Sequence, residues 1–524
     1  MFILDAWENV CHHHIIYILA WIGETAVFLD SINCGHECQD AAGQARLVQE
    51  QFVKYGGMNT FNALASENSA ACIEMRRLVA AANPGLVSLN DQAHVANLLI
   101  GDLCKVEWIQ ACLSKALAVL SYVRGHTRLL AAYTAAKDDY NQSRQPGAAA
   151  AKLTAVEYPT PSTTRFLYNR DVLLACARNR HALRNLVERN DGVEVPRLFK
   201  PRNQAARQSQ AAFVRVAESA SDARDWAAAA AMLDPVAAYL RIFDGQSGRL
   251  SLVLLATMKL QKEMDSIGST LRTSGTVGTA SADVFSQLAA TVAKRVSGPT
   301  DRSVRVLLLE DIHFLAAALD PVVFDAQASD VSIVEERAFR AVRSFFVCSP
   351  VVFSPHQLAT LNDDQRVTLL REQFTAYTGL SGTFSKGAFA ARKPGMEVDI
   401  ASIMTSCWDA LGWWSLYGGS APERREIGKA LSGMSPSSCP VERSFSVQKS
   451  IHTLVRNRLA HDKVSKLMFV HTNLSFLEGR DGLANLPGFL QSVVEEEIMG
   501  VFEGDESGED GGTQEAFSNP VDGE

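Results

Sequence analysis

The feature that most constrains the fold is a change in the pattern of apolar residues near residue 92. Before it, five short segments rich in Val, Ile, Leu and aromatic residues are bounded by Gly, Asn or charged residues, as is typical of β-strands. After it, apolar residues at helical spacing dominate for about three hundred residues. The chain is therefore expected to begin with a mixed α/β region and to continue as a helical one.

The expected strands are Phe2–Trp7, Ile15–Trp21, Ala26–Ile32, Thr60–Ala65 and Leu86–Leu89. Helices are expected at 41–55 and 71–82, so that three hairpin-linked strands are followed by helix, strand, helix and strand. This order predicts a mixed sheet with helices packed against it. Later helices are expected over His94–Leu103, Trp108–Tyr122 and Arg128–Asn141, around Ile400–Tyr417, and in a compact end at Ala421–Asn473.

Length and composition set the class of protein. A chain of 524 residues is too long for one hydrophobic core, and 47% hydrophobic with 21% charged residues is ordinary for a globular protein. The longest apolar stretch near the start, Ile15–Ile22, is far shorter than the roughly 20 residues that span a bilayer, so no membrane anchor is expected. Ten irregularly spaced cysteines favour a reducing, nuclear or intracellular location.

The negative charge is concentrated at the C-terminus. Residues 495–524 contain 11 acidic residues and no Lys or Arg, which predicts a disordered acidic tail. The rest of the chain has 50 basic and 47 acidic residues, so its body can still meet nucleic acid. Residues 165–215 contain 11 Lys or Arg against four acidic residues, a run that can follow a phosphate backbone or form a solvated helix face. The candidate DNA contacts are Arg165, Arg178, Arg184 and Arg202.

Two local clusters allow alternative interpretations. Cys11–His14 and Cys34–Cys38 offer metal-binding side chains, but their spacing is not that of a structural zinc site, and free thiols with exposed histidines are the competing interpretation. Trp413 and Trp414, with Trp408 near by, could stack unpaired bases. Adjacent tryptophans in a helix point ~100° apart, however, and such residues more often anchor a core.

Three blocks near the C-terminus carry the most specific signal. Ser435–Ser446 reads S-P-S-S-C-P-V-E-R-S-F-S, Arg456–Leu459 reads R-N-R-L, and Leu467–Leu474 is an apolar run that ends in N-L. Their order and spacing resemble the C-terminal dimerisation region of hAT-superfamily transposases. The resemblance implies a homodimer or higher oligomer, and the apolar residues expected to support it are Phe445, Leu454, Leu459, Leu467 and Phe469.

Weaker blocks extend the resemblance over most of positions 1–475. They are Asp5–Trp7 (family D-x-W), Ala65–Asn68 (T-D-N), Asp91–Leu98 (C-x-A-H-x-x-N-L), Thr164–Phe166 (T-R-W) and Leu319–Pro321 (L-D-P), and Asp5–Asp102 also resembles a domain of unknown function found in such chains. Glu67 stands where the family has an aspartate, and Asp91 where it has a cysteine.

The resemblance implies an RNase H-like core whose catalytic and metal-binding residues would be Asp5, Glu67 and Glu442, flanked by Asp91 and His94. Two-metal phosphoryl transfer uses carboxylates that hold Mg²⁺ ions, which prefer oxygen ligands. Glu67 adds a methylene and displaces its carboxylate by roughly an ångström, and the chain begins only four residues before Asp5. Weak or lost catalysis, a short first strand and a missing upstream DNA-reading module are therefore expected.

The predicted fold class is α/β but helix-dominated: an RNase H-like mixed sheet split by an all-α insertion, a helical dimerisation region and the acidic tail. The expected divisions are 1–125 for the first part of the core, 126–398 for the insertion, 399–475 for the second part of the core with the dimerisation region, and 476–524 for the extension and tail. The expected function is that of a degenerate or domesticated transposase-derived protein that self-associates and possibly binds DNA. An active Mg²⁺-dependent nuclease or transposase and a helical scaffold without a nucleic-acid role are the alternatives.

Overall fold

We describe the protein from a computed structural model. The described residues are 1–8, 14–22, 25–34, 40–142, 156, 167–188, 203–244, 248–274, 282–298, 306–326, 331–378, 410–451 and 461–478. Most of the Cys11–His14 and Cys34–Cys38 clusters, together with Arg165, Arg202, Leu454, Leu459 and the acidic tail, lie outside these residues.

The N-terminal region forms a five-stranded sheet in the order β3-β2-β1-β4-β5. The strands are β1 (Phe2–Glu8), β2 (His14–Ile22), β3 (Thr25–Asn33), β4 (Ala63–Ser66) and β5 (Val87–Asn90). β1, β2 and β3 pair antiparallel, whereas β4 is parallel to both β1 and β5. The predicted mixed sheet is confirmed, although β4 begins later than expected because a 3₁₀ turn at Gly57–Asn59 precedes it.

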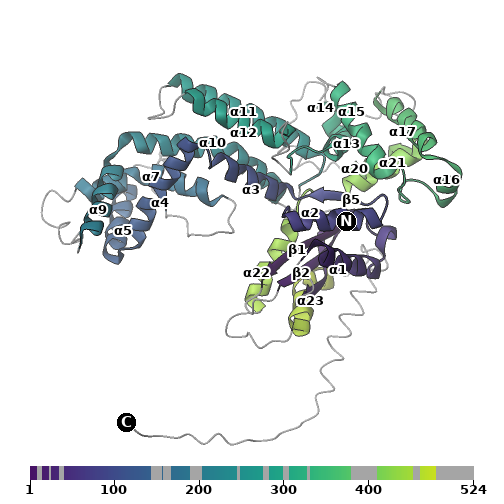
Figure 1. Ribbon diagram of the computed structural model, residues 1–524, viewed down its shortest axis with the longest axis horizontal. Coiled ribbons are helices and arrows are strands. Elements are labelled where there is room, and N and C mark those ends of the chain that lie inside the picture. Colours follow the sequence, from purple (N-terminus) through teal and green to yellow (C-terminus); the bar gives the residue numbers. More distant parts are fainter. Residues whose placement is uncertain are drawn as a thin grey trace, which may run out of the picture.

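The sheet is covered on both faces, which explains why its strands are almost continuously apolar. Every residue of β2 from Ile15 to Trp21 is buried. On one face Phe2 packs edge-on against Phe52 of α1 (Ala41–Lys54), with ring centroids 5.6 Å apart. Residues alternate between faces along a strand, so Asp5 points to the other face, where α22 (Cys439–Ile451) lies. In Figure 1, α1 and α22 flank the strands.

Helices make up most of the rest of the described chain, as expected (Figure 1). They are α2 (Ala70–Ala82), α3 (Gln92–Leu103), α4 (Glu107–Arg124), α5 (Thr127–Gln142), α7 (Tyr168–Glu188), α9 (Gln204–Glu218), α10 (Ala220–Asp244), α11 (Leu252–Ser274), α12 (Ala282–Ser297), α13 (Asp311–Leu319), α14 (Pro321–Ala326), α15 (Val331–Ala341), α16 (Pro355–Thr360), α17 (Asp363–Thr378), α20 (Ala410–Tyr417), α21 (Pro422–Ser432) and α23 (His461–Glu478). Among the described helices, α10 alone is long and apolar enough to cross a membrane, and 67% of its apolar window is buried in the protein.

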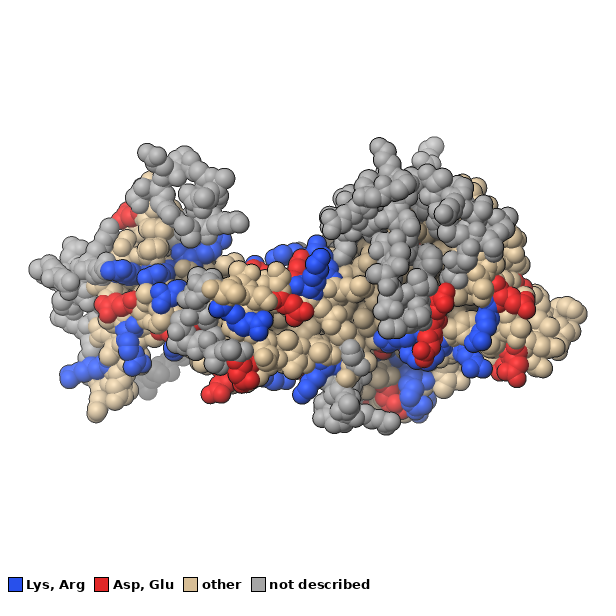
Figure 2. Space-filling view, turned by 90° about the horizontal axis from the view of Figure 1, so that it is seen from above, with Lys and Arg blue, Asp and Glu red and all other residues tan. Residues whose placement is uncertain are grey.

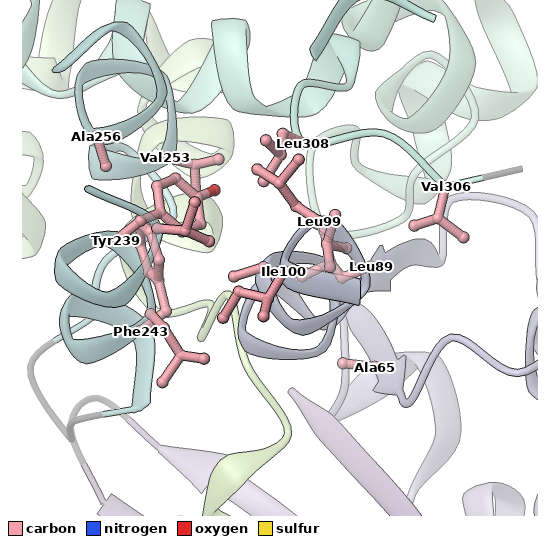
Figure 3. Packing of buried hydrophobic residues seen from close by; sticks show 14 of the residues in the cluster. Ala65, Leu89, Leu99, Ile100, Tyr239, Phe243, Val253, Ala256, Val306 and Leu308 are labelled. Atoms are coloured by element: carbon pink, nitrogen blue, oxygen red, sulfur yellow. The ribbon is translucent and has the colours of Figure 1, made fainter. Parts of the chain in front are cut away.

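The helix α3 joins the sheet to the helical region. Figure 3 shows Leu99 and Ile100 of α3 between Leu89 of β5 and the α10 side chains Tyr239 and Phe243. All five side chains are buried, so one hydrophobic core continues from the sheet into the helices.

Gln92, at the start of α3, completes this junction with polar contacts. Its side-chain oxygen accepts a 2.9 Å hydrogen bond from Tyr239 Oη, and its amide nitrogen lies 3.3 Å from His313 Nε2 of α13. Its backbone N–H donates to the carbonyl of Pro436, which precedes α22. Gln92 is fully buried, so this satisfied network holds three distant parts of the chain together.

The paired tryptophans of α20 are core residues, which confirms that interpretation over base stacking. Trp413 and Trp414 are almost completely buried, and Trp414 Nε1 donates a 2.7 Å hydrogen bond to the carbonyl of Leu319. Asp320, the next residue, accepts from Ser251 Oγ at 2.7 Å. The guanidinium of buried Arg424 lies over the ring of Tyr377, 4.1 Å from its centroid. The L-D-P block and the tryptophan pair therefore meet in one packing unit.

The C-terminal helix α23 covers the edge strand β3. Asn473 accepts a hydrogen bond from the N–H of Phe28 and donates one to its carbonyl, both 2.9 Å long. His461 Nε2 lies 2.9 Å from the carbonyl of Ser31, and Ser31 Oγ donates to Ser465 Oγ. These contacts supply the partners that a sixth strand would otherwise provide.

Candidate functional site

Asp5 lies in the middle of β1, directly opposite Tyr17 of β2. Its side chain is buried, and Oδ1 accepts a 2.8 Å hydrogen bond from the N–H of Ala6. Oδ2 has no hydrogen-bond partner among the described residues. β1 pairs with β2 along its whole length, Asp5 included, and with β4 at Phe2 and Ile3, so the first strand is long enough to place Asp5 within the sheet.

Glu67 follows β4 immediately and is oriented through its backbone. The guanidinium of Arg76 on α2 donates to the carbonyls of Ser66 and Glu67 at 2.8 and 2.7 Å, and to the side chain of Asn90 at the end of β5. Arg76 is almost completely buried. It therefore clamps the ends of two adjacent strands, and with them the position from which Glu67 projects.

Asp91 begins α3 and holds the segment that precedes α22. Its Oδ1 accepts from the N–H groups of Ala93 and His94, at 2.8 and 3.1 Å, and from Ser437 Oγ. Its Oδ2 accepts from both the N–H and the hydroxyl of Ser438. Asp91 therefore caps one helix and docks the start of another, which is a positioning role. His94 is half-buried one turn into α3.

Glu442 comes from the first turn of α22 and completes a group of four carboxylates. The pKa of Asp5 lies well above its usual range, first because the carboxyl is buried and then because of the charges of Glu67, Glu442 and Asp91. Burial, Asp91, Asp244 and Glu67 together raise the pKa of Glu442 to about 7. None of the four forms a salt bridge within the described residues, so the raised pKa values of Asp5 and Glu442 reflect acids that no described ion pair stabilises.

Two thiols that sequence reasoning missed lie at this acidic group. Cys72 Sγ donates to Glu67 Oε1 at 3.6 Å. Cys439, Glu442 and Asp91 each place a ligand atom within 4.8 Å of the others. The spacing of Cys439 and Glu442, three residues apart on one helix, was a usable signal. Cys72 follows Glu67 by only five residues, but the turn between β4 and α2 decides that their side chains meet.

The other proposed residues are placed as follows. Phe469 is buried within its own chain, whereas Phe445 is half-buried and packs against Tyr17, with ring centroids 5.3 Å apart. Leu467 is 46% exposed and remains available for self-association. Arg178 and Arg184 lie on α7, where each interacts with other groups of the chain.

Comparison with known families identifies two segments of the chain that contribute to the acidic group. Residues 1–119 match the family model for a domain of unknown function, DUF659, and residues 393–474 match that of the hAT family C-terminal dimerisation region. These two matches support an hAT-family transposase-derived protein. Asp5, Glu67 and Asp91 lie in the first matched segment of this hAT-related protein and Glu442 in the second, so the fold brings the two segments together at the acidic group. The dimerisation region supports self-association. A search of curated proteins found no match.

Proposed function

We propose that this hAT-related protein has an RNase H-like core and cleaves DNA strands by Mg²⁺-dependent phosphoryl transfer. The observation that carries the proposal is that β1, the end of β4 and the start of α22 come together, so that Asp5, Glu67 and Glu442 act on one another's charge although the last is 437 positions from the first. The strand order, with an antiparallel hairpin group on one side and parallel strands on the other, supports the RNase H-like assignment. A nuclear or intracellular location forms part of the same proposal.

The residues present fit Mg²⁺, because carboxylate oxygens are its preferred protein ligands. Asp5, Glu67 and Glu442 would hold the metal, and the bound metal would activate an attacking oxygen and stabilise the leaving one. The free Oδ2 of Asp5 and the carboxylate of Glu442, which accepts no hydrogen bond from the described residues, are both available for this. Arg76 and Asp91 act as positioning residues through the contacts described above.

Cleavage of a labelled DNA duplex in Mg²⁺ tests the proposal. Asp5→Asn and Glu442→Gln should each lower the rate by at least about 10²-fold, the scale expected when a catalytic geometry is lost. Glu74→Gln is the matched control, since Glu74 is an exposed carboxylate on α2 that pairs with Arg77. A wild-type protein that binds DNA but shows no metal-dependent cleavage would refute the catalytic proposal.

That outcome would favour the second candidate, DNA association without cleavage. The specific observation behind it is the longer Glu67 side chain, whose Oε1 is engaged by Cys72 rather than left free. Exposed Arg207 and Arg215 on α9 line a hollow of about 560 Å³ at one end of the helical region. Lys and Arg side chains are spread over that end, with a few acidic ones between them (Figure 2). Protein that binds no DNA would instead favour a helical scaffold.

A further inference from the structure

The thiol of Cys439 makes the acidic group chemically different from a site built only of carboxylates. Cys439 and Glu442 lie three residues apart on α22 and so project from the same helix face. Their ligand atoms and a carboxylate oxygen of Asp91 are within 4.8 Å of one another, close enough for all three to contact a single ion. Sulfur is a poor ligand for Mg²⁺ but a good one for Zn²⁺, which also accepts carboxylate oxygens.

We propose that Cys439, Glu442 and Asp91 form a Zn²⁺ site. The hydrogen bonds from Ser437 and Ser438 hold the Asp91 carboxylate in a fixed orientation, as the surroundings of metal-binding carboxylates commonly do. The five hydrogen bonds that Asp91 accepts fix its carboxylate beside Cys439 and Glu442, so that it can supply the third bond to the metal. On binding, the thiol of Cys439 releases its proton to water and the thiolate binds the metal.

The carboxylate of Asp5 adds negative charge next to this group. The Asp5 side chain is only 6% exposed and its Oδ2 has no hydrogen-bond partner among the described residues, although Glu67, Glu442 and Asp91 all act on its charge. A carboxylate in such a place is neutralised either by a proton, as its raised pKa indicates, or by a bound cation. Because Glu442 belongs both to this set and to the proposed Mg²⁺ ligands, Zn²⁺ is expected to inhibit Mg²⁺-dependent cleavage.

Titration of the reduced full chain with Cd²⁺, which substitutes for Zn²⁺ and gives an ultraviolet thiolate charge-transfer band, tests the site without measuring activity. The wild type should show a saturable band that added Zn²⁺ removes. Cys439→Ser should abolish the band, and Glu442→Gln should keep it but weaken binding by about tenfold or more. Cys112→Ser, at a buried thiol of α4, and Cys348→Ser, at an exposed thiol, are controls that should leave it unchanged.

Absence of the band in the wild type, or its survival in Cys439→Ser, would overturn the Zn²⁺ proposal. Because unfolding would also remove the band of Cys439→Ser, Glu442→Gln serves as a second test that leaves the thiol in place. A Cd²⁺ affinity of Glu442→Gln equal to that of the wild type would also overturn the proposal. The outcome is separate from the proposed function. A band without DNA cleavage would refute catalysis alone, and cleavage without a band would refute the Zn²⁺ site alone.

Discussion

At the scale of single residues, Glu310 shows how the junction between sheet and helices depends on charge. Its Oε1 accepts a 2.7 Å hydrogen bond from Asn90, the same residue that Arg76 contacts from α2. Burial raises the pKa of Glu310 to about 7, and Asp311 adds to this effect, while Arg76 and Arg337 oppose it. Because the folded pKa exceeds the usual 4.5, the added stability is present below pH 4.5 and is lost as pH rises through 7.

Glu310→Gln should remove this pH dependence while keeping an acceptor for Asn90. Between pH 4.5 and 8 the unfolding free energy of the wild type should fall relative to that of the variant, by at most about 3 kcal/mol. Denaturant unfolding at several pH values measures the difference. Glu336→Gln, at an exposed carboxylate paired with Arg340, is the control and should follow the wild type. Parallel curves for wild type and Glu310→Gln would contradict the prediction.

At the scale of elements, the contact of α23 with β3 assigns a structural role to part of the dimerisation region. Asn473 satisfies both backbone groups of Phe28 at the edge of the sheet. Phe469 and Met468 are buried beside it. The apolar run that ends in N-L therefore closes the sheet of its own chain, and only its exposed positions, such as Leu467, are free to meet a second copy.

Asn473→Leu keeps the side-chain volume but leaves the N–H and carbonyl of Phe28 without partners. Each unsatisfied buried group costs about 1–3 kcal/mol, so we expect a loss of stability of at least that size and faster hydrogen exchange at the Phe28 amide. Thr472→Val is a control on the same helix, because the buried Thr472 hydroxyl has no hydrogen-bond partner in the described structure. Equal effects of the two substitutions would show that Asn473 does not hold the edge.

At the scale of the whole molecule, α3 and α10 separate the sheet and its acidic group from the end formed by α4, α5, α7 and α9 (Figure 1). A DNA duplex bound at both places would therefore meet acids and positive side chains at different points along its length. Arg207 and Arg215 are exposed on α9, and neither forms a salt bridge within the described residues. Both are therefore available for phosphate contacts if the protein binds DNA.

Replacing Arg207 and Arg215 together by Ala should lower the slope of log affinity against log salt by roughly 0.9 for each phosphate of duplex DNA that the protein no longer neutralises. Fluorescence anisotropy on a short duplex measures the slope. The matched control is the Arg77→Ala and Arg340→Ala pair, since both residues are exposed but held in salt bridges to Glu74 and Asp311. An unchanged slope in the Arg207 and Arg215 double variant would place the phosphate contacts elsewhere.

The sequence by itself determined the strands, most helices and the family. Strand and helix patterns depend on residues close together in the chain, and the blocks around Glu442 and Leu467–Leu474 are themselves local. Only the tertiary structure decided which distant side chains meet: Ser438 with Asp91, Asn473 with Phe28, and Phe445 with Tyr17. Such pairs join residues whose contact depends on how helices pack on the sheet, and no local periodicity encodes that packing.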